Sequence, residues 1–354
     1  EFEAALEFNR ELHKNAPDNP GYCRDCSVGC GRIASLLSGT EDKRKKDFLE
    51  ERITFSQDAC DFAQKSDREG KTTNHIPLDK LYDELASALN DIGQWFAFDS
   101  QPSQADKAQE AWKRAREGAG WGLKLDGKFS EALRTSIGIS FMLEGQFLHS
   151  EAVRLAAQLS ADEKVSDEPD PTVTGMNHQN SPTDQEPLVS TQSDSLPMNP
   201  NVEALFLASA NAFTESADFL RNWDRINALH NRAFALHELH DFGAEREVLE
   251  QIIDALRALT PEEKSSPPES FGSILYNLLG LGSAHEGLSE AFQLLLRHEK
   301  KQIDTETQLD GWALGTAWSI IGSIWEDASL HDEAAEFLRH AVDLFEVASE
   351  TLPA

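Results

Sequence analysis

Apolar residues recur along most of this chain at intervals of three and four, the spacing that places them on one face of an α-helix. One stretch carries large, small and aromatic residues in a fixed order: Trp318, Ile321, Gly322, Trp325, Ala334, Leu338 and Ala341. Such a set is typical of two antiparallel helices that pack closely. No convincing alternation of period two is found, so the pattern predicts an all-α chain without paired strands.

The same order of residues returns at several places. The copy from Leu89 contains Ile92, Gly93, Phe96, Ala108, Trp112 and Ala115. The copy from Leu229 contains Ala233, Leu236, Phe242, Leu249 and Ile252, and the copy from Leu275 contains Leu278, Leu279, Ala291 and Leu295. The copy from Leu229 is a loose one. In a second loose copy, a first helix with Ile137, Gly138, Phe141, Gly145 and Phe147 leads to a second helix at Ala152. Neighbouring copies start about 43 to 46 residues apart where no long insertion intervenes.

This order of small and bulky positions resembles the signature of tetratricopeptide repeats. Their usual repeat is about 34 residues, and the longer spacing here resembles the variant found in kinesin light chains. The resemblance implies a right-handed superhelical array, an α-solenoid of about five to six antiparallel helix hairpins. An array of HEAT-like or irregular helical repeats is the structural alternative.

One acidic segment interrupts the periodic pattern. We expect helical hairpins over residues 1–160, a disordered insertion rich in acidic residues, serine and proline over 161–200, and further hairpins over 201–354. The insertion is interpreted as a tolerated loop, or alternatively as a docking segment regulated by phosphorylation at Ser181. Because Glu1 falls inside an apparent helix, the chain is expected to be part of a longer protein.

The formal net charge of −30 at pH 7 is the strongest bias in composition. It argues against nucleic acid as a partner, because phosphate groups need clustered lysine or arginine. The basic run at residues 43–46 is interpreted as a solvated helix start. A partner with a basic surface or tail would be favoured, although the acidity could serve solubility alone. No run of eighteen apolar residues is found, so we expect no membrane span and a cytoplasmic protein.

Four cysteines give the sharpest chemical hypothesis. Cys23, Cys26 and Cys30 share one helix face, and Cys60 is expected from the facing helix of the same hairpin. Four thiolates could hold zinc or an iron-sulfur cluster, which would suit a redox sensor. Small buried thiols in a reducing compartment are the simpler interpretation, so no metal or other cofactor is predicted.

The histidines and the search for enzyme motifs change the functional interpretation little. His230, His237 and His240 lie seven and three residues apart on one expected helix, but the spacing around Glu238 is not that of the zinc protease motif. We interpret them as exposed helix residues, with half a metal site at His237 and His240 as the alternative. Phosphate loops, nucleophile elbows and kinase motifs are absent from the sequence, so the chain is predicted not to be an enzyme.

The tetratricopeptide resemblance implies peptide or protein binding in a concave groove lined by the first helices of the hairpins. The residues expected there are Asn90, Gln94, Thr135, Ser140, Asn231, Phe234, Tyr276, Asn277, Ser319 and Ser323. Repeats that clamp the C-terminal carboxylate of chaperones carry lysine or arginine at the fifth position, where this chain has asparagine, threonine, histidine, tyrosine and serine. A chaperone tail is therefore not the expected partner.

The sequence as a whole predicts a non-catalytic interaction module, a scaffold or recognition arm. The alternative is the recognition domain of a larger signalling protein or enzyme whose effector domain lies outside these residues.

Overall fold

The computed structural model describes residues 1–37, 43–70, 76–100, 102–166 and 198–260, together with residues 335, 338, 339, 342 and 343. All regular secondary structure within these ranges is helical. The helices are α1 (Phe2–Asn15), α2 (Pro20–Leu36), α3 (Lys43–Arg68), α4 (Leu78–Gln94), the π-helix η1 (Trp95–Asp99), α5 (Ala105–Leu123), α6 (Ser130–Ser166), α7 (Pro200–Phe219), α8 (Asn222–Glu238) and α9 (Phe242–Ala258). The all-α class is confirmed. The copy from Leu275 and every member of the register from Trp318 except Leu338 lie outside the described residues.

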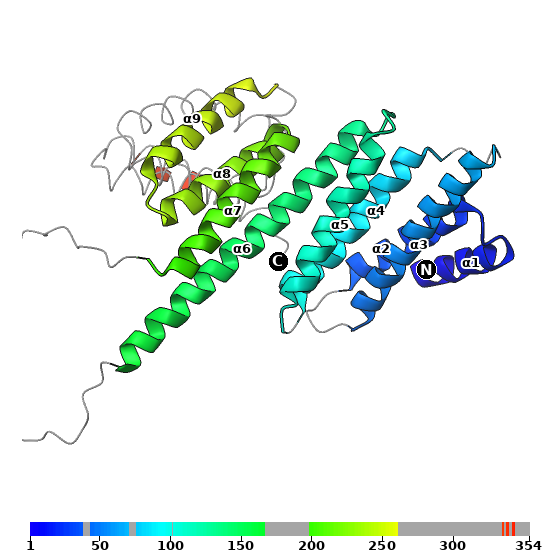
Figure 1. Ribbon diagram of the computed structural model, residues 1–354, viewed down its shortest axis with the longest axis horizontal. Coiled ribbons are helices and arrows are strands. Elements are labelled where there is room, and N and C mark those ends of the chain that lie inside the picture. The colour runs from blue at the N-terminus through cyan, green and yellow to red at the C-terminus, as the bar shows by residue number, and fades with distance from the viewer. Residues whose placement is uncertain are drawn as a thin grey trace, which may run out of the picture.

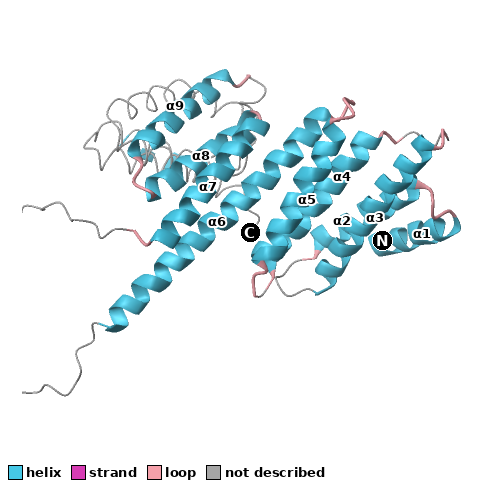
Figure 2. Cartoon of the chain, viewed as in Figure 1, coloured by secondary structure: helices cyan, strands magenta, loops and turns pink. Residues whose placement is uncertain are grey.

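Consecutive helices pack as hairpins: α2 on α3, α4 on α5, α6 on α7 and α8 on α9, and each hairpin contacts the next. Figure 1 shows this order as a row of helices from α1 at one end to α9 at the other, and Figure 2 shows only helices and loops in the drawn cartoon. The first pair is antiparallel, because Ser27 bonds to Ser56 at 2.7 Å while Arg52 lies against Gly31. The array of antiparallel helix hairpins predicted from the sequence is therefore present.

An asparagine followed by proline begins two of these helices. Asn19 Oδ1 accepts a hydrogen bond from the Gly21 amide, and Asn199 Oδ1 accepts one from the Asn201 amide, both at 2.9 Å. The proline occupies the first helical position, where its missing N–H costs nothing. The local sequence thus fixes where α2 and α7 start.

The longest helix, α6, corrects one sequence prediction. Ile137, Gly145 and Ala152 were expected on two helices of one hairpin, but all lie on α6, which runs for 37 residues. The physical reason is that residues 148–151 contain neither glycine nor proline, so nothing ends the helix there. The second helix of this hairpin is α7. The boundary expected at residue 161 also falls inside α6, and most of the expected insertion, residues 167–197, lies outside the described residues.

Small residues bring α6 and α7 close together. Gly138 and Gly145 lie seven residues apart on α6, opposite Ser216 and Ser209, which lie seven apart on α7. Ser216 donates its hydroxyl proton to Gly138 O at 2.8 Å, and Ser209 donates to Gly145 O at 2.9 Å. Both serines are fully buried. We call these four residues the glycine-serine seam, and the pairing shows that the two helices are antiparallel.

A glycine also brings α4 and α5 close together, here by leaving room for a tryptophan ring. Trp112 is completely buried, and its indole ring lies so close to Gly93 that a Cβ there would be 2.5 Å from Nε1. Gly93 and Trp112 are both members of the repeating set found in the sequence. Those positions therefore hold the helices together, and binding residues must be sought between them.

A candidate binding cleft between α4, α6 and α8

An open cleft of about 400 Å³ lies on the side of the array formed by the first helices of successive hairpins. Pockets of roughly 300 to 1,000 Å³ commonly hold small ligands, so the cleft is at the lower end of that range. Its lining residues come from α4, η1, α6, α7 and α8: Gln94, Phe98, Gln146, His149, Ser150, Phe213, Asn231 and Phe234. The set combines three phenylalanine rings with three side-chain amides.

The π-helix η1 places Phe98 at the edge of the cleft. This five-residue turn follows α4 directly and ends at Ser100, whose amide donates to Trp95 O at 2.8 Å. π-helical turns are rare in proteins, and those that do occur are often found at functional sites. Phe98 remains 37% exposed while its ring meets Phe147 edge to face, so it offers apolar surface to a ligand.

One face of α6 supplies the middle of the cleft. Gln146, His149 and Ser150 lie three and four residues apart, which places them together on the helix surface. The Ser150 hydroxyl donates to Gln146 O at 2.9 Å. That hydroxyl is therefore engaged with the helix itself, and the Gln146 amide remains the main polar group of this face.

His149 is the titratable side chain among the lining residues. Its ring meets Phe206 edge to face at 5.2 Å and lies tilted against Phe234 at 5.6 Å. Burial lowers the pKa of His149, with Glu238 acting in the opposite direction. The neutral form of the imidazole is therefore favoured, and its Nδ1 is buried with no hydrogen-bond partner among the described residues.

Two asparagines from α8 face this part of α6. Asn231 donates to Asn227 O at 3.0 Å, and Asn227 Nδ2 lies 3.7 Å from the Met142 sulfur. These contacts orient the Asn231 amide with its donor group directed to its own helix. Within the described residues no donor contacts its Oδ1, so this oxygen can accept a hydrogen bond at the cleft.

The structure separates the residues expected in the groove. Gln94, Asn231 and Phe234 line the cleft together. Asn90 does not, and its prediction is corrected: it is only 4% exposed and donates to Ser136 O at 3.0 Å. Ser140 is also corrected, because it is fully buried and donates to Trp112 O.

Of the other residues expected in the groove, only Thr135 is described, and it does not line the cleft. Thr135 is partly exposed, and its hydroxyl donates to Glu131 O at 3.1 Å on its own helix. Tyr276, Asn277, Ser319 and Ser323 lie outside the described residues.

Sequence reasoning missed several lining residues. His149 and Ser150 were missed because a turn was expected between Phe147 and Ala152, and Gln146 lies just before that expected turn. A strict reading of the uninterrupted helical spacing over this stretch would have placed all three on one face. Phe98 follows α4 in a π-helix, and no periodic signal in the sequence marks such a turn.

The four cysteines are buried free thiols. They divide between two parts of the core: Cys23 and Cys60 pack in one apolar cluster, and Cys26 and Cys30 pack with Leu6 in another. Burial raises the pKa of Cys26 to about 11 and of the other three to about 12. Over the described ranges, no group of three or more potential ligands is arranged to hold a metal ion.

The three histidines of α8 and its end have separate environments, and the expectation that all are exposed is corrected for His230. This side chain is 6% exposed, and burial lowers its pKa to about 4. His237 Nδ1 lies 3.1 Å from the buried carboxylate of Glu245. His240 is exposed and adopts a positive φ of 56° at the end of the helix.

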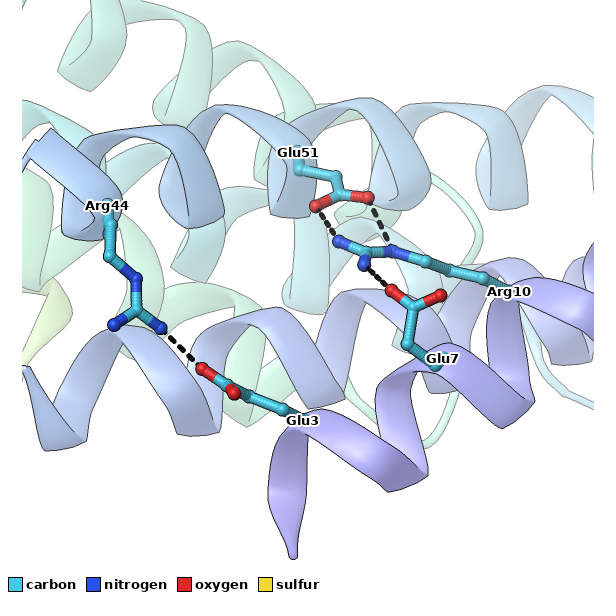
Figure 3. Close-up of polar contacts among 5 residues, drawn as sticks. All are labelled: Glu3, Glu7, Arg10, Arg44 and Glu51. Atoms are coloured by element: carbon cyan, nitrogen blue, oxygen red, sulfur yellow. Dashed lines mark hydrogen bonds and ion pairs between the residues drawn. The ribbon is translucent and has the colours of Figure 1, made fainter.

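Three of the four residues in the basic run at the start of α3 are paired with acids. Arg44 contacts Glu3 of α1, as Figure 3 shows, and Lys45 Nζ lies 2.6 Å from Asp99 of η1. Lys46 pairs with Glu50 at 3.2 Å. The run thus tethers neighbouring elements to α3.

A second arginine ties α1 to α3. Figure 3 shows Arg10 between Glu7 and Glu51, and its Nε donates to Glu51 Oε1 at 2.9 Å. Arginine and carboxylate meet here with two donors on one acceptor group, the strongest common form of such a pair.

Where the structure describes the chain, no helix is long and apolar enough to cross a membrane.

Comparisons with known proteins found no family model that matches and no matching curated protein. Among solved structures, a monomeric mutant of IFIT1 with Gppp-AAAA superposes with a TM-score of 0.34 and 12% identity, covering 97% of this chain and 67% of that one. The human IFIT1 dimer with PPP-AAAA gives 0.33 and 12%, covering 97% and 69%. The apo quorum sensor NprR from B. thuringiensis gives 0.27 and 13%, covering 97% and 87%. Because these TM-scores are low, the fold is defined by the helices and their packing described above and not by these superpositions.

Proposed function

We propose that this chain is a non-catalytic interaction module that binds a peptide or protein segment in the cleft between α4, α6 and α8. The observation that carries the proposal is the meeting of three side-chain amides, Gln94, Gln146 and Asn231, with three phenylalanine rings in one open cleft. An amide both donates and accepts hydrogen bonds, so it can pair with either group of a peptide backbone. Aromatic rings can bury the side chains of the same segment.

The chemistry of the lining supports binding over catalysis. His149 favours its neutral form and packs against rings, and the Ser150 hydroxyl donates to the helix backbone. A nucleophile needs a base within hydrogen-bond reach that is itself oriented by a third group. The polar groups of the lining can contact a ligand, and they do not form such a set of nucleophile, base and orienting group.

Charge supports a protein partner over a nucleic acid. The chain has a formal net charge of −30, and the basic run at residues 43–46 is paired with acids where its partners are described. A basic stretch in the partner would be attracted to this surface. Glu238, whose carboxylate acts on His149, lies on α8 beside Phe234 and could meet a basic residue at the edge of the cleft.

Two finer statements also belong to the proposal. The long hairpins fit the long-repeat variant that resembles kinesin light chains, since α2, α4 and α6 start more than about 50 residues apart against a usual repeat of about 34. A recognition domain within a larger cytoplasmic signalling protein is the alternative role, and the same cleft would serve it.

The test is a selection of random peptides displayed on phage, with the whole chain as bait, followed by calorimetry on the selected peptides. Replacing Gln146→Ala or Asn231→Ala should weaken binding about two- to tenfold, the effect of one lost hydrogen bond. Gln109→Ala is the matched control, an exposed glutamine of α5 away from the cleft. Failure to select any peptide, or equal binding by all three variants, would overturn the proposal.

A further inference from the structure

The lining of the cleft is uncharged, and this limits what it can hold. None of the eight lining residues is Lys, Arg, Asp or Glu. Two nearby charged side chains are engaged elsewhere: Asp99 lies 2.6 Å from Lys45, and Glu144 lies 2.7 Å from Arg116. Glu238 acts on His149 from the edge of the cleft but does not belong to the lining. A charged ligand group inside the cleft would therefore lose water without a charged partner in the lining, which is costly.

The three rings are placed to receive one side chain. Phe213 is buried and belongs to the lining, Phe98 stands exposed on η1, and Phe234 is partly buried on α8. They come from three different elements and all line this one cleft, where Phe213 is only 1% exposed. An apolar side chain bound there would be removed from water by contact with aromatic carbon atoms on several sides. An aromatic side chain could also contact the rings edge to face.

The amides lie around this space from three directions. Gln94 ends α4, Gln146 lies on α6, and Asn231 lies on α8, where its Nδ2 donates to Asn227 O. A peptide unit on either side of an anchor side chain carries one N–H and one C=O, which these amides match.

Resting on the proposed function, we infer that the cleft is an anchor site for one uncharged apolar residue of an extended peptide, Phe or Leu in kind, with Phe98, Phe213 and Phe234 holding its side chain and Gln94, Gln146 and Asn231 holding the flanking peptide units. Specificity then resides in the rings, and general affinity resides in the amides.

The smallest probes of this inference are N-acetyl amino acid amides, each of which carries one side chain between two peptide units. Binding of the phenylalanine, leucine, lysine and glutamate forms to the whole chain is measured by ligand-observed NMR titration at pH 7.5. The phenylalanine and leucine probes should bind at least tenfold more tightly than the lysine and glutamate probes.

Variants separate the two parts of the site. Phe98→Ala and Phe234→Ala should reduce the preference for phenylalanine over lysine to about threefold or less, whereas Gln146→Ala should weaken all bound probes by a similar factor. Gln109→Ala should change nothing. Phe98 is partly exposed on the edge of the cleft, so its variant keeps the test valid if Phe234→Ala does not fold, as judged by circular dichroism.

Two results would overturn the inference. One is a lysine or glutamate probe that binds as tightly as phenylalanine. The other is no binding of any probe while selected peptides bind in a way that depends on Gln146, in which case the proposed function stands and the anchor site does not. Selected peptides that ignore Gln146 and Asn231 would instead overturn the proposed function.

Discussion

Single side chains in this array are held by burial more than by polar partners, and His230 is the extreme case. It lies on α8 at 6% exposure, and neither ring nitrogen has a hydrogen-bond partner within the described part of the chain. Burial lowers its pKa to about 4 because the charged imidazolium would lose its water there. The neutral ring acts as an apolar core residue that remains sensitive to acid.

We therefore expect acid to destabilise the protein through His230. His230 binds a proton near pH 6.5 in the unfolded chain and only near pH 4 in the folded chain. The stabilisation that its neutral form gives is therefore fully present above pH 6.5 and is lost as the pH falls from 6.5 to 4. The loss at pH 5 relative to pH 7.5 should be about 2 kcal/mol. Urea unfolding at both values measures it, and His230→Leu should remove this share. An unchanged pH dependence in His230→Leu would contradict the assignment.

The buried thiols should be unreactive in the native protein. Burial raises the pKa of Cys23, Cys30 and Cys60 to about 12 and of Cys26 to about 11, and only the thiolate reacts with iodoacetamide. At pH 8 intact mass should show no rapid labelling of the folded chain and four labels in urea. Fast labelling of any one cysteine in the folded chain would mean that its helix opens readily.

At the scale of elements, the glycine-serine seam explains how α6 and α7 pair. Glycine at 138 and 145 leaves room for Leu220 and Phe213, and the serine hydroxyls of α7 bond to the carbonyl oxygens exposed by those glycines. Such close approach depends on the absence of side chains on one helix. The pair should therefore tolerate almost no added volume.

Gly145→Ala should destabilise the chain by about 1 to 3 kcal/mol, because the new Cβ would lie 2.8 Å from the buried ring of Phe213. The matched change Gly120→Ala on α5 meets no atom within 4 Å and should stabilise by about 0.5 to 1 kcal/mol. Urea unfolding followed by circular dichroism compares them. Equal effects of the two substitutions would show that the seam does not limit packing.

Helices were predicted best where the repeating set of residues is present in the sequence. The hairpins of α4 with α5 and of α8 with α9 both carry this set. The prediction failed within α6, where a loose match to the repeat outweighed the lack of any helix-ending residue. The bounds of a helix depend on such local signals, whereas the partner of α6 is chosen by packing at residues 209 and 216.

Site residues were predicted less well, for a physical reason. Asn90 and Gln94 lie four residues apart on one helix, yet the first is buried against α6 and the second lines the cleft. Spacing alone cannot separate them, because the difference depends on how far the neighbouring helix reaches along α4. The π-turn of η1 then carries Phe98 into the cleft.

On the scale of the whole molecule, the stability of the array comes mainly from contacts between neighbouring helices. Helices pack mainly on those next to them along the array, as in other helical repeats, and α1 packs mainly on α2. The ion pairs of Figure 3 add a second attachment, since Arg10 and Glu3 of α1 reach Glu51 and Arg44 of α3. The end helix should therefore open before the middle of the array.

Hydrogen exchange should show this order, with amides of α1 protected less than those in the middle of α6. Arg10→Ala removes the pair with Glu51 and should lower protection in α1 several-fold while α6 and α7 keep theirs. Arg154→Ala, which breaks a pair with Glu151 within α6, is the control and should leave α1 unchanged. Uniform loss across all helices would indicate that the array opens as one unit.

The unbroken length of α6 has a mechanical consequence. The cleft touches this helix at Gln146, His149 and Ser150, and the helix continues to Ser166 beyond the start of α7 in Figure 1. Sixteen residues of α-helix span about 24 Å, so a tilt of about 5° at the cleft displaces the far end by about 2 Å. Ala152, Leu155 and Leu159 in this stretch pack with Val202 and Phe206 near the start of α7. A tilt of α6 at the anchor site would therefore carry the start of α7 with it, and the displacement would be largest where the chain leaves α6.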